Sequence, residues 1–153
     1  MTTATEAYNA LKQRLIDAAL GVPLRWQGDN KDSNGNVELP DTPATFIYSE
    51  MIAEPAELVA YGGGPLQNLY RNPARFVSYV FIPRNTGLTT ATDLAEAIAQ
   101  QFRSYRTAQI SCFDATVHPG GDGAQLTPPG LTSEVNNYFW ASTEVSLFFD
   151  QLG

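Results

Sequence analysis

The stretch "RFVSYVFIP", residues 75–83, carries the clearest strand pattern in this 153-residue chain. Its side chains alternate between two apolar sets, which are Val77, Tyr79 and Phe81 on one side and Phe76, Val80 and Ile82 on the other. A strand with one wet face alternates apolar and polar residues, whereas a strand covered on both faces is apolar throughout. Residues 75–83 are therefore predicted to form a central strand of a sheet.

A first helix is predicted over residues 4–20. Thr3 and Glu6 have the spacing of a capping box, in which each side chain bonds the backbone amide of the other residue. Apolar side chains then recur at helical spacing, at Tyr8, Leu11, Leu15 and Ala18. Gly21 and Pro23 are expected to end this helix, because glycine favours the C-terminal cap and proline prevents the helix from resuming.

A second amphipathic helix is predicted after the turn at residues 84–87. Thr90 and Asp93 resemble a capping box, so we expect the helix to begin next to Thr90. Its buried stripe is predicted from residues spaced by four, namely Leu94, Ile98 and Phe102. Arg103 and Arg106 are expected in the last turn, where positive charge interacts favourably with the helix dipole.

The remaining strands are predicted from runs rich in aromatic and β-branched residues. They are "PLRWQG" at 23–28, "ATFIYSEMI" at 44–52, "ELVAY" at 57–61, "AQISCFDATV" at 108–117 and "YFWASTEVSLFF" at 138–149. Polar or Gly- and Pro-rich loops are expected at 29–43 and 118–137. The order of elements predicts one α+β domain over residues 1–153, a mostly antiparallel sheet with two helices packed on one face and a long protruding β-hairpin.

Three consecutive glycines, Gly62–Gly64, allow two interpretations. A phosphate-binding loop needs a following Lys-Ser or Lys-Thr pair, or a helix that opens at the glycines. Pro65 and an extended segment follow instead, and glycine adopts the positive φ that a tight turn requires. We therefore interpret the glycines as the tip of a hairpin. Its strand at residues 53–61 would span about 30 Å if fully extended, so the hairpin is expected to project as an arm.

A protruding arm usually contacts a partner, and arms and sheet edges are surfaces through which chains can meet. Two segments are candidates here, residues 53–73 and residues 119–136. The candidate assembly residues are Tyr61, Gly62, Gly63, Gly64, Leu66, Leu69, Tyr70, Arg71, Leu126 and Leu131.

The composition limits the possible partners and locations. Nine basic and sixteen acidic residues give a net charge of −7, which argues against binding a phosphate backbone but allows DNA to pass nearby without sticking. No run approaches the roughly 20 apolar residues of a membrane helix, and the first residues lack a signal-peptide pattern. A single cysteine, Cys112, excludes an internal disulfide. These features predict synthesis in a reducing cytoplasm.

Other functional classes have weaker signals. Residues 29–41 place Asn30, Asp32, Asn34, Glu38 and Asp41 near the ligand positions of a calcium loop, but Pro40 and Pro43 block the helix that should follow. A small calcium- or ligand-binding module therefore remains an alternative, next to a solvated loop. His118, the only histidine, is expected to be an exposed bystander, and Cys112 a buried apolar residue. We expect no catalytic site, cofactor or metal.

The central segment resembles a known family. Residues 75–105, "RFVSYVFIPRNTGLTTATDLAEAIAQQFRSY", are similar to the centre of the lambda-type tail terminator family of long-tailed phages. In that family a strand ending in an apolar-Pro pair turns through a glycine into an amphipathic helix that ends in Phe-Arg. The opening helix, the "PLRW" strand at 23–26 and the terminal "VSLFFD" strand at 145–150 fit the same pattern.

The resemblance implies a structural protein of the virion. Six copies would form a hexameric ring on the finished tail tube, stop further addition of the major tail tube protein, and offer the other face to the head–tail connector or stopper protein. DNA would pass through the lumen without specific binding. The resemblance also allows a second assignment, another neck or head–tail completion protein with a different neighbour.

Overall fold

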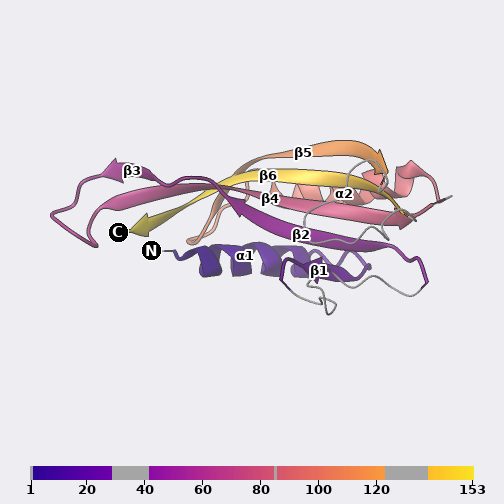
Figure 1. Ribbon diagram of the computed structural model, residues 1–153, viewed down its shortest axis with the longest axis horizontal. Helices are drawn as coiled ribbons and strands as arrows, with labels where there is room; N and C mark the ends of the chain where they lie inside the picture. The colour runs from indigo at the N-terminus through magenta and orange to yellow at the C-terminus, as the bar shows by residue number, and fades with distance from the viewer. Residues whose placement is uncertain (1, 29–41, 85, 123–137) are drawn as a thin grey trace.

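The computed structural model describes residues 2–28, 42–84, 86–122 and 138–153. In chain order the elements are α1 (Ala4–Asp17), β1 (Leu24–Trp26), β2 (Phe46–Ala53), β3 (Glu57–Ala60), β4 (Leu69–Pro83), α2 (Leu88–Phe102), β5 (Ser111–Asp122) and β6 (Tyr138–Leu152). The six strands form one sheet in the order β1-β2-β4-β6-β5, with β3 paired to one end of β4. Figure 1 shows this elongated sheet with its two helices, which confirms the predicted α+β fold.

Strand β4 is the central strand, as its apolar pattern predicted. It lies antiparallel between β2 and β6, and Phe81 sits between Phe46 and Trp140 in the register of these three strands. The predicted strand began at residue 75, whereas β4 begins at Leu69. The sequence did not predict this extension because Arg71 and Asn72 break the apolar pattern. Their strand conformation comes from pairing with neighbouring strands.

Both helices contribute to one hydrophobic core on a single face of the sheet. Leu11 and Leu15 of α1 and Ile98 and Phe102 of α2 are fully buried in it, together with Phe76 of β4. The rings of Phe76 and Phe102 lie 5.5 Å apart between sheet and helix. This packing confirms that the two helices share one face of the sheet.

The opposite face of the sheet has its own aromatic cluster. Its buried members are Phe46, Tyr48, Phe81, Tyr138 and Trp140. Phe46 stacks on Phe81 with 4.9 Å between ring centroids, and Tyr138 meets both rings edge-on. The two apolar sets of β4 therefore serve two cores, one on each side of the sheet.

The ends of both helices differ from the prediction. The capping box of α1 is present, with the Thr3 amide 2.7 Å from Glu6 Oε2, but the helix ends at Asp17. Helix α2 begins at Leu88, three residues before the predicted start, with Gly87 as its N-cap. Thr92 Oγ1 donates to the Leu88 carbonyl inside the helix, so these threonines are helical residues and not a cap.

The last turn of α2 also differs. Helix α2 ends at Phe102, so Arg103 is its C-cap and Arg106 lies beyond it. The chain then turns at Thr107, whose side chain accepts from the amides of residues 109 and 110, which delays the start of β5 to Ser111. Strand β5 continues to Asp122, through residues that were predicted as loop. It is an outer strand with a register shift between His118 and Gly121, a place where Pro119 is tolerated.

Candidate assembly interface

A long arm forms because β2 and β3 pair one after the other with the same side of β4. Residues 46–53 pair with 74–81 of β4, and Glu57 and Leu58 pair with Arg71 and Tyr70. Between the two strands the Glu54 amide donates to the Pro73 carbonyl at 2.9 Å, so the ladder continues across the interruption at Pro55. In Figure 1 β3 and its turn lie at one end of the molecule, beyond both helices.

The glycines form the tip of this arm, as predicted. A Cβ atom on Gly62 would lie 1.9 Å from the backbone oxygen of Gln67, so no larger residue fits without opening the turn. Gly63 and Gly64 have φ values of +97° and +127°, which favour glycine. The Gly62 amide donates to Asn68 Oδ1 at 3.1 Å, which closes the turn. Strand β4 follows, and not a helix, so the phosphate-loop interpretation does not fit this segment.

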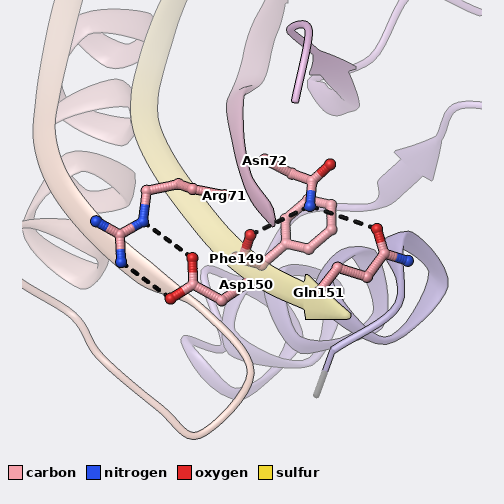
Figure 2. A network of polar contacts seen from close by, with 5 residues as sticks. All are labelled: Arg71, Asn72, Phe149, Asp150 and Gln151. Carbon is pink, nitrogen blue, oxygen red and sulfur yellow. Dashed lines mark hydrogen bonds and ion pairs between the residues drawn. The ribbon is translucent and has the colours of Figure 1, made fainter. Parts of the chain in front are cut away.

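The last residues of β6 brace the stem of the arm. Arg71 Nε and Nη2 donate to the two carboxylate oxygens of Asp150, each at 2.9 Å (Figure 2). The Arg71 guanidinium also lies 3.9 Å from the ring centroid of Phe148. Hydrogen bonds from Arg71 lower the pKa of the Asp150 carboxyl below its usual value, and the same bonds raise the pKa of Arg71.

Two further contacts hold the arm to β6. Asn72 Nδ2 points between the Phe149 carbonyl and Gln151 Oε1, at 3.5 and 3.4 Å (Figure 2). Asn68 and Gly153 exchange two backbone hydrogen bonds of 3.0 and 3.1 Å. The arm is thus a three-stranded structure at its base, made of β3, β4 and the end of β6, and it is held in an extended shape before it meets any partner.

The outer part of the arm is apolar and exposed. Its exposed fractions are 40% for Leu58, 48% for Val59, 86% for Tyr61 and 76% for Leu66. Residues 58–70 contain no Asp, Glu, Lys or Arg, although the whole chain carries a net charge of −7. An exposed apolar patch of this kind marks a surface that contacts another molecule.

The predicted interface residues fall into three groups. Tyr61, Gly62–Gly64 and Leu66 form the exposed turn, whereas Leu69, Tyr70 and Arg71 are half-buried in the stem. Arg71 is committed to the brace with Asp150, a role that its position in the sequence did not reveal. Leu126 and Leu131, and most of the segment 119–136, lie outside the described residues.

Three strands, β1, β3 and β5, lie at the edges of the described sheet. Strand β1 pairs with β2. Beyond β1 the Gln27 amide donates to the Ser49 carbonyl, and Gln27 Oε1 accepts from the Met51 amide. On the other side, Ser104 and Tyr105 make backbone bonds of 3.2 and 2.8 Å to β5. Among the described residues β3, like β1 and β5, has a strand partner on one side only, and its outer edge lies next to the exposed apolar side chains of the arm.

A buried acid lies on the face of the sheet that carries no helix. Glu50 is 3% exposed, and its Oε2 accepts from the Tyr48 hydroxyl at 3.3 Å. Burial raises the pKa of Glu50, and it raises the pKa of Tyr79 to about 12. Sequence reasoning missed this group, although its position within an apolar strand was the available signal. The arrangement supplies a buried polar cluster at the centre of the sheet.

The other sequence candidates do not gather into a site. His118 is exposed on β5, and burial raises the pKa of the Cys112 thiol to about 12. Within the described ranges, no group of three or more His, Cys, Asp or Glu side chains is placed to hold a metal ion. The possible calcium loop at 29–41 falls outside those ranges. Neither described helix has the length and apolar character to cross a membrane.

Comparison with known proteins adds no family. The sequence matches no protein-family model and no curated protein.

Proposed function

We propose that this chain is a structural virion protein that acts as a tail terminator. It assembles as a ring on the end of the phage tail tube, stops polymerisation of the tube protein and provides the surface for the head–tail connector. The observation that carries this proposal is the braced, uncharged arm with its exposed apolar tip. An arm of this kind is suited to hold a neighbouring subunit and has no evident use in an isolated domain.

The resemblance of residues 75–105 gives the arm its context. Strand β4 ends at Pro83, the chain turns through Gly87, and α2 runs to Phe102 and its cap Arg103. This strand, turn and helix follow the order that the tail terminator family uses. We infer six copies per ring from the same resemblance, with the ring assembled in the host cytoplasm and located at the tail–neck junction of the virion.

The charge of the chain suits a channel for DNA. Each copy contributes a net charge of −7, so a ring of such copies is strongly acidic. An acidic ring repels phosphates, which suits a lumen through which DNA passes without specific contacts.

The experiment adds the purified protein to polymerising tail tube protein and measures tube lengths by electron microscopy. Tail termination predicts shorter tubes that carry a ring at one end. The control is the same amount of protein with its arm tip disabled by Leu66→Asp, which should leave tube lengths near those of tube protein alone. If the unaltered protein leaves tube length and tube ends unchanged, the terminator function is wrong. If it binds a connector but not the tube, the neck-protein alternative replaces it.

A further inference from the structure

The proposed ring needs two different surfaces that fit each other, and the structure places one at each edge of the sheet. The first is the arm tip, with Leu58, Val59, Tyr61 and Leu66 exposed beside β3. The second is a hollow of about 250 Å³ beside β5, lined by Thr2, residues 107–111 and Phe148–Asp150.

The hollow lies level with the stem of the arm, and the arm tip extends beyond it along the strands. The stem of the arm pairs with β6 at Asp150–Leu152, and β5 pairs with β6 from Phe148. In the sheet order, β3 and β5 lie on opposite sides of the central pair β4 and β6. Because the tip extends beyond the level of the hollow, a second copy brings its arm tip to the hollow of the first copy by rotation about an axis inclined to the strands. Such a contact joins unlike surfaces and can close into a ring.

The charges of the two surfaces favour a second copy as the occupant. Two copies with a net charge of −7 each repel one another, and uncharged surfaces in contact add no further repulsion. The arm has no charged residue from 58 to 70, and the loop at 107–111 has none either. Asp150 is the charged residue of the hollow, and its carboxylate is already paired with Arg71.

The hollow also has an apolar border that can receive the arm. Phe148 lines it, and the ring of Phe113 lies 5.0 Å from that of Phe148. Phe113 is 45% exposed and lies at the register shift between Cys112 and Ala115. The aromatic pair offers a contact surface to the apolar side chains of the arm tip.

We propose that the arm tip of one copy docks into the hollow between residues 107–111 and Phe148–Asp150 of the next copy. This inference rests on the proposed function, because it names the contact that joins the ring. Tyr61 and Leu66 supply the apolar contacts of the arm. The outer edge of β3 lies beside the neighbour at this contact.

Site-directed cross-linking tests the contact. Tyr61→Cys and Gln109→Cys place one thiol on the arm and one on the loop of the hollow. Cys112 is buried and should not react with the cross-linker. The two variants are mixed in equal amounts and treated with a short bis-maleimide, after light scattering has measured the assembly. The expected result is a covalent dimer in the mixture and not with either variant alone. A chain that carries both cysteines should give a ladder that stops at the size of the ring.

The outcomes separate the docking contact from the ring itself. Dimers of Tyr61→Cys alone would show arm-to-arm contact and overturn the proposal. An assembled ring without the mixed product would also overturn it, while leaving the ring intact. A protein that stays monomeric at every concentration, with and without tube protein, would refute both.

A matched pair of variants tests the same contact without cross-linking. Leu66 has a φ of +65°, a conformation that Asn and Asp both tolerate, so Leu66→Asn and Leu66→Asp differ mainly in charge. We expect Leu66→Asp to weaken assembly at least about tenfold more than Leu66→Asn, because it places a charge against a second acidic copy. Equal assembly of the two variants would contradict a buried tip.

Discussion

Replacement of Phe81 by alanine tests whether the face without helices holds a true core. Phe81 is fully buried, stacks on Phe46 at 4.9 Å and meets Tyr138 edge-on at 6.1 Å. Truncating a buried phenylalanine removes its transfer free energy and leaves a cavity, which together cost about 3–5 kcal/mol. Domains have total stabilities of about 5–15 kcal/mol, so this loss takes away a large fraction of the free energy of unfolding.

Urea unfolding followed by circular dichroism measures this loss. With a urea dependence of about 2 kcal/mol per M, a loss of 4 kcal/mol lowers the midpoint by about 2 M. The matched control is Phe113→Ala, because Phe113 is 45% exposed and has one ring neighbour, Phe148. We expect the control to cost less than about 1 kcal/mol. If Phe81→Ala costs as little as the control, the aromatic cluster is not a second core and the reasoning about the two faces of β4 fails.

Three further perturbations probe the buried acid, the brace and the tip. Burial raises the pKa of Glu50, so between about pH 4.5 and the raised pKa the folded protein keeps the Glu50 proton while the unfolded chain loses it. The free energy of unfolding should therefore fall as pH rises through this window. Glu50→Gln should make stability less dependent on pH in this window, which urea unfolding midpoints measured at several pH values would show. Between Arg71 and Asp150, a double-mutant cycle should give a coupling of about 0.5–1 kcal/mol, since both side chains are about one-third exposed; a coupling of zero would mean that the ion pair does not brace the arm. Gly62→Ala should speed amide exchange in the arm, because its Cβ would collide with a backbone oxygen. Gly21→Ala meets no atom within 4 Å and strains only its own backbone, at a φ of +77°, so it should leave exchange in the arm unchanged.

The sequence predicted those parts of the fold whose local pattern agrees with their packing. The apolar sets of residues 75–83 were assigned to the correct faces, and the capping box of Thr3 and Glu6 is present. The prediction failed where tertiary pairing overrides local preference. Arg71 and Pro73 interrupt the apolar pattern of β4, yet they are held in the strand because they pair with Asp150 and Phe148 of β6.

The candidate site was predictable in outline and not in its construction. Three glycines between two extended segments indicated a hairpin tip. The observed turn favours glycine because Gly63 and Gly64 have positive φ values. Nothing local connects Arg71 with Asp150 or residue 68 with Gly153, because these partners lie about half the chain apart. The contacts that hold the base of the arm to β6 therefore could not be predicted from local sequence patterns.

In the proposed ring, the braced base and the uncharged surface of the arm would both lower the cost of contact between two acidic copies. A flexible segment would lose conformational entropy when it docks, and a charged one would meet repulsion from a copy with a net charge of −7. The three-stranded base removes the first cost before assembly, because β6 already holds the arm extended. The uncharged run from 58 to 70 removes the second. In the proposed ring, the contact between copies would then depend on apolar burial and on the outer edge of β3, and the carboxylates would lie on other surfaces.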